Sequence, residues 1–352
     1  MSTPAFAAAP VTATSAAAPA PASVASPARP PIALPAFPGL AAPAARAAPS
    51  RLSLVFAFTV IYLVWGSTFL GIRVAVETLP PLTMAAVRFL LAGGLLGAFA
   101  WARLRPGEPR PTLLHWRNAA VTGGLFFLGN HALVSTNARL LPSSLVCLII
   151  ATEVPVIALL SAALLPGRPL TRRSVLGAAL GLLGVVWLFA GPGGAGAETP
   201  FWPCLAILGA SLSWSLGAVT SQRLALPANP LLRAAMQMIL GGALLAIASA
   251  LRGEPALIDL HAFSARSLFA LGYLVAFGSV LAFACYSFLL KHVRTDAVAT
   301  HVFVNPLVAV ALGAWLGGES LHAAHLVAGL FILASVCVIT LGRPAAPRPA
   351  EE

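Results

Sequence analysis

The chain has 352 residues, 59% of them hydrophobic and only 9% charged, and its mean hydropathy is +0.91. Soluble domains carry about 25% charged residues because their surfaces face water, so this composition excludes an ordinary soluble globule and predicts an integral membrane protein. The net charge of +11 comes from basic residues scattered over short loops, which argues against nucleic acid as a partner and is typical of cytoplasmic membrane-protein loops.

Residues 1–50 form an Ala/Pro-rich tail that we expect to be disordered. The tail has no acidic residue, and Arg29 and Arg46 are its only charged side chains. A segment of this composition cannot bury enough apolar surface to fold. The first membrane span is therefore predicted to begin just after it.

The chain from residue 52 to residue 341 alternates apolar runs with short polar loops. A run of about 20 apolar residues spans the hydrocarbon core as a helix, whereas a transmembrane barrel shows alternating strands of about 10 residues. We therefore predict an all-α integral membrane protein with ten transmembrane helices in the lipid bilayer. The predicted spans are 52–72, 82–101, 118–138, 143–164, 174–190, 202–222, 231–250, 268–290, 298–316 and 324–341.

Basic residues in the predicted loops indicate how the chain is oriented. With the N-terminus inside, the inner segments hold fifteen Lys and Arg residues, whereas the outer loops hold four: Arg73, Arg139, Arg252 and Arg266. Cytoplasmic loops carry the excess of basic residues in membrane proteins. We therefore expect both termini to be cytoplasmic, including a short tail at 342–352.

The two halves of the chain resemble each other. The stretch "LPPLTMAAVRFLLAGGLLGAFA" (79–100) matches "NPLLRAAMQMILGGALLAIAS" (229–249) at a shift of 149 residues, which becomes 151 further along. We interpret the match as a duplication, with a first repeat at 51–191 and a second at 202–341. The aligned pairs include Pro81 with Pro230, Gly93 with Gly242, Trp65 with Trp214, Gly129 with Gly278, Pro155 with Pro306 and Gly167 with Gly318.

Each repeat holds five predicted spans, an odd number, so the second repeat is predicted to lie upside down relative to the first. The loops support this independently, because "GRPLTRR" in the first repeat is basic, whereas its counterpart "GESLHAAH" has lost the arginines and gained Glu319. Equivalent loops of opposite charge belong on opposite faces. Inverted five-helix repeats recur in secondary transporters, whose site lies near the midplane between the halves.

A family resemblance supports this interpretation. The stretches "VWGSTFLGIRVAVETLPPLTMAAVRFLLAGGLL" and "VNPLVAVALGAWLGGESLHAAHLVAGLFILASVCVI" resemble the drug/metabolite transporter superfamily, EamA type, over residues 55–341. The resemblance implies a bacterial inner-membrane permease of ten helices that exports amino acids or other small metabolites. Gly167-Arg168 departs from the family's usual Gly-Glu, so no carboxylate role is carried over to that loop. The most specific marks are Trp65-Gly66, Pro81, Arg88, Pro306 and Gly318-Glu319.

Arg88 lies inside the second predicted span, seven residues past Pro81. Its aligned residue is the neutral Gln237, so the shared scaffold does not require the charge. One interpretation is that the side chain reaches outward or ties helix ends together. The other is that it faces a central cavity and attracts an anionic group of the substrate. Both interpretations stay open at this point.

Glu153 lies about ten residues into the fourth predicted span, near the bilayer centre, and its aligned residue is Val304. A carboxylate is expensive in hydrocarbon, and a proton-coupled carrier needs a group that binds and releases a proton as access alternates. Glu153 is therefore a candidate for substrate binding or proton coupling. An internal pair with Arg88 or His131, or a misplaced helix boundary, would be the alternatives.

Asn130 and His131 on the third span are further candidate binding residues, although a lone membrane histidine is more often a hydrogen-bonded packing residue. His301 lies near the inner end of the ninth span, where an interfacial role is expected. Neither Asn130 nor His131 has an equivalent of the same type in the second repeat, where Ser279 and Val280 are aligned with them.

Trp65 and Trp214 are aligned mid-helix positions, away from the interfaces where tryptophan concentrates. They are candidates for two walls of a central substrate pocket, with ordinary helix packing as the alternative. Ser67 would add a polar contact nearby. Asn305 precedes Pro306, which frees a backbone carbonyl for a ligand or simply kinks the helix.

Other motifs, present or missing, limit the classes of function that are possible. No G-x-x-x-x-G-K-[ST] phosphate loop is present, and none of the four cysteines forms a C-x-x-C pair, so we expect no ATP drive, cofactor, metal site or disulfide framework. The small-residue motifs permit close helix approach, including in a homodimer. These motifs are Gly93-x-x-x-Gly97, Gly177-x-x-x-Gly181 and Gly313-x-x-x-Gly317.

Two other classes of function were weighed. A membrane-embedded enzyme could use His131, Glu153 and His301, but the sequence has no G-x-S-x-G or H-E-x-x-H motif. A non-transporting sensor would need a folded soluble domain to deliver its signal. We therefore expect a secondary transporter that exports a small metabolite by alternating access and carries no catalytic residue.

Overall fold

The computed structural model describes residues 49–104, 108–167, 169–190, 200–293, 295–298, 300–320 and 323–340. The Ala/Pro-rich tail up to residue 48, the C-terminal tail and Arg168 lie outside these described residues, so the expectations for them stay predictions. Across the described ranges the chain is helical and contains no strand. This confirms the all-α prediction.

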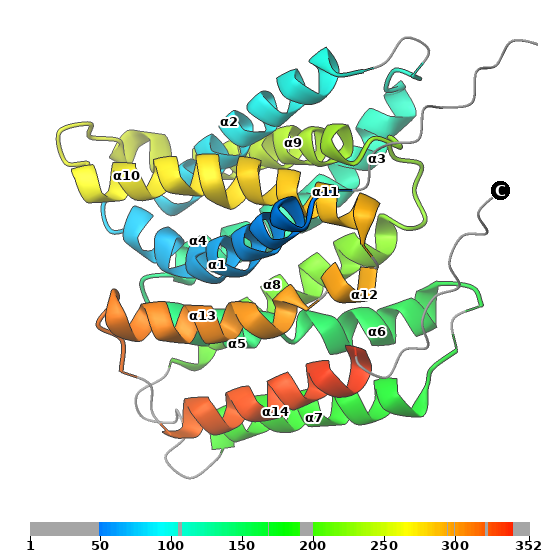
Figure 1. Cartoon of the computed structure of the whole chain (residues 1–352). Coiled ribbons are helices and arrows are strands. Elements are labelled where there is room, and N and C mark those ends of the chain that lie inside the picture. The colour runs from blue at the N-terminus through cyan, green and yellow to red at the C-terminus, as the bar shows by residue number, and fades with distance from the viewer. Residues whose placement is uncertain are drawn as a thin grey trace, which may run out of the picture. The chain divides into compact units, whose positions relative to one another are not determined.

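The helices follow the predicted apolar runs closely (Figure 1). Eight helical segments of the described residues are long and apolar enough to cross a membrane, while the segment 113–137 and the shorter helix His301–Trp315 are not among them. The elements are α1 (Arg51–Ala75), α2 (Pro81–Ala102), α3 (Leu113–Gly123), η1 (Gly124–His131), α4 (Ala132–Asn137), α5 (Ser143–Ile150), α6 (Glu153–Leu164), α7 (Arg172–Ala190), α8 (Phe201–Thr220), α9 (Pro230–Leu251), η2 (Glu254–Leu257), α10 (Ala265–Tyr273), η3 (Leu274–Leu281), α11 (Ala282–His292), α12 (Thr295–Val298), α13 (His301–Trp315) and α14 (Ala323–Thr340).

Local sequence signals explain where many of the helices begin. Pro81 and Pro230 stand at the first turns of α2 and α9, where the missing proline N–H costs nothing. The Asn229 side chain caps α9 by accepting from the backbone N–H groups of residues 231 and 232. Ser264 and Ser50 cap α10 and α1 in the same manner.

The fourth predicted span, 143–164, coincides with the segment Ser143–Leu164, which is long and apolar enough to cross a membrane, but it is not one regular helix. The span is broken into α5 and α6 by a turn at Ala151 and Thr152. Pro155 has no N–H to offer the carbonyl of Ala151, and its ring clashes with that carbonyl in a regular helix. The Thr152 hydroxyl donates to the Ile149 carbonyl at 2.7 Å, which gives the backbone an alternative to the helix ladder.

The ninth predicted span, 298–316, corresponds to α13, which begins three residues later than predicted, and the short helix α12 ends just before it, at Val298. The Thr300 hydroxyl donates to the Ala297 carbonyl at 2.5 Å. The two breaks therefore use the same device, a threonine that bonds back to the carbonyl three residues earlier.

The third and eighth predicted spans also differ from regular helices. Each contains an eight-residue π-helix, η1 at Gly124–His131 and η3 at Leu274–Leu281. A shift of 149 residues carries η1 onto residues 273–280, within one residue of η3. Such wide turns in a helix frequently occur at functional sites.

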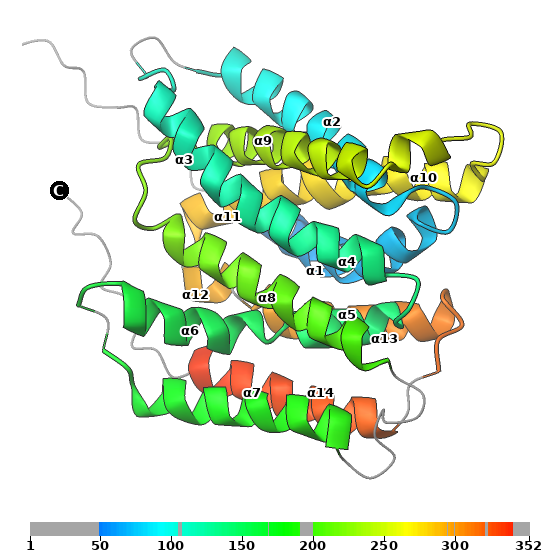
Figure 2. The same ribbon diagram turned by 180° about the vertical axis from the view of Figure 1, so that it is seen from behind.

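Helices from the two halves pack as antiparallel neighbours. Figures 1 and 2 show α2 beside α9 and α7 beside α14. The glycines at the α2–α9 contact are used reciprocally, because a Cβ at Gly93 would lie 2.9 Å from Ile239, and one at Gly242 would lie 3.0 Å from Leu90. Leu90 and Ile239 are themselves separated by 149 residues. The Gly93 and Gly177 motifs thus serve close packing within one chain.

The remaining helix contacts exchange between the halves in the same way. Helix α1 packs against α13 and against the α10–η3–α11 segment, while α8 packs against α6 and the α3–η1–α4 segment. In Figure 2, α8 lies between the α3–α4 segment and α6. Each of α1 and α8 therefore contacts a broken helix and a π-containing helix.

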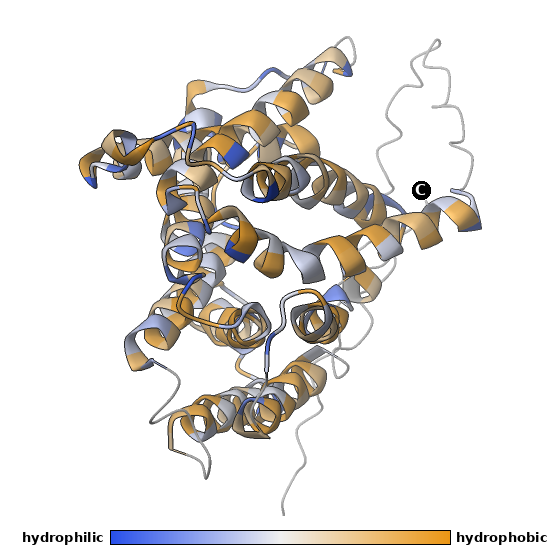
Figure 3. Cartoon of the chain, turned by 90° about the vertical axis from the view of Figure 1, so that its left-hand side faces the viewer, coloured by the Kyte–Doolittle hydropathy of each residue, from blue (hydrophilic) through white to orange (hydrophobic). Residues whose placement is uncertain are grey.

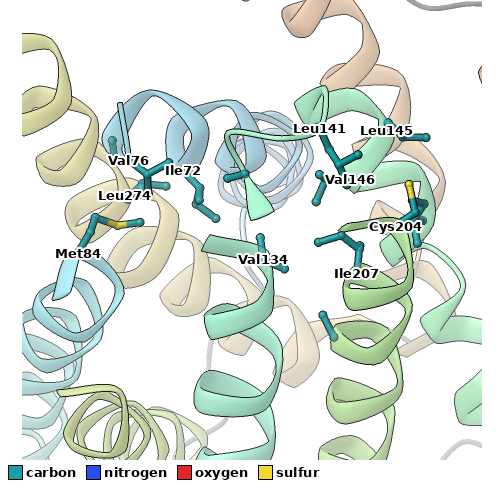
Figure 4. Close-up of a cluster of buried hydrophobic side chains, with 14 of the residues drawn as sticks. Ile72, Val76, Met84, Val134, Leu141, Leu145, Val146, Cys204, Ile207 and Leu274 are labelled. Atoms are coloured by element: carbon teal, nitrogen blue, oxygen red, sulfur yellow. The ribbon is translucent and has the colours of Figure 1, made fainter. Parts of the chain in front are cut away.

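Apolar side chains from both halves form the interior. Figure 3 shows hydrophobic residues along most of every helix, as expected of a chain whose outer surface faces lipid. Figure 4 shows one buried cluster, which joins α1, α2, α4, α5, α8 and η3. Its members include Ile72, Val76, Met84, Val134, Leu141, Leu145, Val146, Cys204, Ile207 and Leu274.

Candidate functional site

Two hydroxyl pairs fix the helix breaks at equivalent places. At the α5–α6 break, the Thr152 hydroxyl lies 2.9 Å from the Ser211 hydroxyl of α8. At the α12–α13 break, the Thr300 hydroxyl lies 2.6 Å from the Tyr62 hydroxyl of α1. Tyr62 and Ser211 are aligned by the 149-residue shift, so each break is hydrogen-bonded to the same position of the long helix that contacts it.

Glu153 and His301 directly follow these threonines and are the first residues of α6 and α13. The sequence alignment pairs Glu153 with Val304, whereas counting from the threonine at each break pairs it with His301. Broken helices whose half-helix ends meet near the midplane commonly form the sites of secondary transporters. A carboxylate at the start of α6 is also favoured by the positive end of that helix's dipole.

The Glu153 side chain is partly buried, and in the described ranges its carboxylate has no hydrogen bond or ion pair. The Ser215 hydroxyl contacts only the backbone carbonyl of this residue, at 3.3 Å. The proposed internal pairs with Arg88 and His131 are therefore not formed in this structure. Glu153 is left as a polar group inside a predicted membrane span.

Arg88 is buried in α2, with 4% of its surface exposed, so it does not reach outward to the membrane surface. Its Nε donates to the Ser279 hydroxyl in η3 at 3.1 Å. The guanidinium lies over the ring of the neighbouring Phe89, 4.7 Å from its centroid. The buried cation of the first half is therefore hydrogen-bonded to the π-helix of the second half.

Trp65 also contacts η3, because its indole Nε1 donates to the carbonyl of Gly278 at 3.2 Å. Its ring lies 5.0 Å from His301, 5.3 Å from Tyr286 and 5.5 Å from Phe283. His301 is therefore an aromatic neighbour of Trp65 rather than an isolated interfacial residue. Its Nδ1 lies 2.8 Å from the carbonyl of Val298.

Trp214 occupies a second aromatic cluster, formed around η1. Its ring lies 4.7 Å from Phe126 and 6.3 Å from His131. His131 in turn lies 4.6 Å from Phe89, the ring over which the Arg88 guanidinium lies. The Nδ1 of His131 is buried and has no hydrogen-bond partner among the described residues. The two tryptophans thus belong to separate clusters, each with a histidine.

The remaining candidate residues make structural hydrogen bonds. Asn130 donates to the Ala210 carbonyl of α8 at 2.9 Å, and the Ser67 hydroxyl lies 2.6 Å from the Tyr273 hydroxyl. The Asn305 amide nitrogen is assigned toward two carbonyls, those of His301 at 3.0 Å and Tyr62 at 3.2 Å. Asn305 therefore braces α13 against α1.

Glu319 lies outside the helices and joins the start of α5 to the end of α1 by polar contacts. Its carboxylate accepts from the backbone N–H groups of Ser143 and Ser144 and from the Ser144 hydroxyl, and it pairs with Arg73 at 2.8 Å. Burial raises the pKa of the Glu319 carboxyl, but the Ser144 and Ser143 hydrogen bonds outweigh this effect and hold the pKa below its ordinary value. Glu254 caps α2 similarly, through the N–H groups of residues 82 and 83.

Sequence reasoning missed several of these features. It did not identify Phe89, Tyr62, Tyr273 or Tyr286 as neighbours of the candidate residues, nor the two π-helices. The aligned glycines Gly129 and Gly278 were the available signal, because both fall inside a π-helix. Among the described residues, no three or more His, Cys, Asp or Glu side chains gather where they could hold a metal ion.

Comparison with known proteins identifies the family. Residues 52–190 and 201–341 each match the EamA-like transporter family. The chain belongs to that family. This EamA-like transporter is 37% identical, over 301 residues, to the "Uncharacterized inner membrane transporter YedA" of Escherichia coli (strain K12), with 84% of the chain and 94% of the relative covered. The resemblance to the drug/metabolite transporter superfamily is thereby confirmed, as is a multi-pass inner-membrane protein.

More distant relatives agree. The "Probable amino-acid metabolite efflux pump" of Salmonella typhimurium is 25% identical over 295 residues, covering 82% of this chain and 94% of that protein. A protein of known crystal structure has a TM-score of 0.56 and 24% identity, covering 83% of this chain and 98% of its own. The named relatives are transporters rather than enzymes, and the solved structure supports the fold.

Proposed function

We infer that this EamA-like transporter is a secondary transporter that exports amino acids or other small metabolites by alternating access, with proton coupling through Glu153. The observation that carries the proposal is the pair of broken helices, α5–α6 and α12–α13, each hydrogen-bonded at its break to the equivalent position of the other half. Two such breaks provide symmetric hinges at which access could alternate. The name of the amino-acid efflux relative supports the substrate class.

The exchange of helix contacts between the halves supports the inverted-repeat architecture with ten spans. In this arrangement the segment 113–137 and the α12–α13 unit are the third and ninth spans. The basic residues then place both termini in the cytoplasm. Tag-accessibility mapping would test the topology, since residues near 105 and 258 should be on opposite sides of the membrane. Labelling from the same side would overturn the inversion.

Flux measurements would test the transport proposal. In vesicles reconstituted with the full chain, a pH gradient should drive saturable movement of radiolabelled amino acids. Glu153→Gln should slow this flux at least ten-fold and make it insensitive to the gradient. Glu77→Gln is the matched control, because that carboxylate is 42% exposed and pairs with Arg266 at the surface. Equal flux in both variants would remove Glu153 from the mechanism.

The proposed contacts to a substrate come from both halves. Trp65 and Arg88 meet at η3, while Asn130, His131 and Trp214 gather around η1, and Glu153 follows the break beside α8. Ser67 connects α1 to α10, the helix that precedes η3. Asn305 connects α13 to α1. The hydrogen bonds of Ser67 and Asn305 within the chain indicate that these two side chains position the neighbouring elements rather than contact a substrate directly.

A further inference from the structure

Arg88 is a buried cation without a counter-ion. In the described part of the chain, the ion pairs join Arg73 with Glu319 and Arg266 with Glu77, and no carboxylate lies within 4.0 Å of the Arg88 guanidinium. Buried charges in proteins are normally paired, and ionisable side chains inside membrane spans commonly mark substrate pathways. The missing partner therefore requires an explanation.

The helix packing that the two halves share does not explain why Arg88 lacks a counter-ion. The aligned position in α9 is Gln237, which is also buried and donates through its amide nitrogen to the Thr122 hydroxyl at 2.8 Å. A neutral side chain with one hydrogen bond therefore satisfies this packing position in the second half. The cationic group in the first half must serve something that the shared fold does not require.

Among the described residues, the Arg88 guanidinium donates only through its Nε, and its terminal nitrogens have no hydrogen-bond acceptor. Phe89 covers one face of the cation. On the η3 side lies Gly278, where a Cβ would come 3.4 Å from an Arg88 terminal nitrogen and 3.2 Å from the methyl group of Thr68. The glycine keeps this space free of a side chain. The neighbouring Ser279 hydroxyl accepts from Arg88 and retains its own hydrogen for another acceptor.

We propose that Arg88 and Ser279 bind the carboxylate of the transported molecule, next to Gly278. The planar guanidinium matches a carboxylate in two parallel hydrogen bonds, and the serine hydroxyl supplies a third donor. The substrate class is thus small carboxylates, including amino acids. Amines without a carboxylate and uncharged metabolites are excluded. This assignment rests on the proposed transport function and adds the chemical group that the site recognises.

A binding experiment on the purified full chain in detergent tests the assignment without requiring transport. The probes are acid and amide pairs of equal shape: acetate with acetamide, 4-methylpentanoate with 4-methylpentanamide, and phenylacetate with phenylacetamide. For at least one pair the wild type should bind the carboxylate ten-fold or more tightly. Arg88→Gln, which copies the residue of the second half, should abolish that preference.

Arg233→Gln is the matched control, since Arg233 on α9 also uses its Nε in a single hydrogen bond, to the Pro227 carbonyl at 3.1 Å. This variant should keep the preference for carboxylates. A wild type that binds acids and amides equally, or a preference that survives Arg88→Gln, would overturn the proposal. Retained preference in a protein that moves no amino acid in vesicles would instead reject the transport function and leave the carboxylate site standing.

Discussion

Glu319 offers a quantitative test of how the end of α1 and the start of α5 are held together. Its side chain is only 2% exposed, whereas that of its partner Arg73 is 35% exposed. It accepts three hydrogen bonds from Ser143 and Ser144, at 2.7, 3.1 and 2.6 Å. Replacement by glutamine keeps the shape but removes the charge and turns an amide N–H₂ toward donors.

The magnitude follows from the buried carboxylate rather than from the ion pair. Water screens the half-exposed arginine, so its share is at most about 1 kcal/mol. Hydrogen bonds to a charged acceptor contribute about 1.5–3 kcal/mol each, but they are not additive and they offset the cost of burying the charge. We expect Glu319→Gln to lower the free energy of unfolding by about 3 kcal/mol, within the usual range for breaking a buried charged pair.

Thermal unfolding in detergent, followed by circular dichroism, measures this effect. Glu319→Gln should lower the midpoint by several degrees, and Glu77→Gln by much less, because that side chain is 42% exposed. The depressed pKa of Glu319 means that its contribution is present above its unfolded-state pKa and is lost as the pH falls through the folded-state value. The gap between wild type and Glu319→Gln should therefore close on acidification. Equal midpoints for the two variants at neutral pH would refute the reasoning.

Two further predictions concern the helix breaks and the helix contacts. Thr152→Val and Thr300→Val should each lower the free energy of unfolding by about 1 kcal/mol in the same assay, since each removes one hydrogen bond between two hydroxyls; a large loss from only one would contradict their equivalence. Gly184→Ala should cost about 1–3 kcal/mol, because its Cβ would lie 2.8 Å from the Ala328 carbonyl oxygen, whereas Gly94→Ala, with no neighbour within 4 Å, should be neutral or slightly stabilising. Equal midpoints for the two glycine variants would show that α7 and α14 are packed less closely.

Much of the helix layout could be predicted from composition and hydropathy. A residue in lipid must satisfy its backbone within its own helix, so long apolar runs reveal the spans to within a few residues. The π-helices and the two breaks could not be predicted in this way. Their side chains remain apolar, and the deviation lies in backbone hydrogen bonding, which the hydropathy pattern does not record. Only Pro155 gave a local warning, at the α5–α6 break.

The candidate site was predictable in part. A charged residue inside an apolar run is visible in any sequence, so Arg88 and Glu153 were recognised as unusual. Their neighbours were not, because Ser279 and Gly278 lie about 190 residues from Arg88 along the chain. The alignment also paired Glu153 with Val304, since shared prolines dominated its register. Counting from the threonine at each break gives another register, in which Glu153 corresponds to His301.

The sequence by itself determined that this protein is a helical membrane protein, because hydrocarbon favours apolar side chains and regular backbone hydrogen bonding along the whole of each span. Its repeated prolines, tryptophans and glycines also pointed to a duplicated unit. Only the tertiary structure decided which polar groups have partners. That outcome depends on distances between helices far apart in the chain. Within the described residues it left Arg88 and Glu153 without counter-ions, while Glu319 and Glu254 became helix caps.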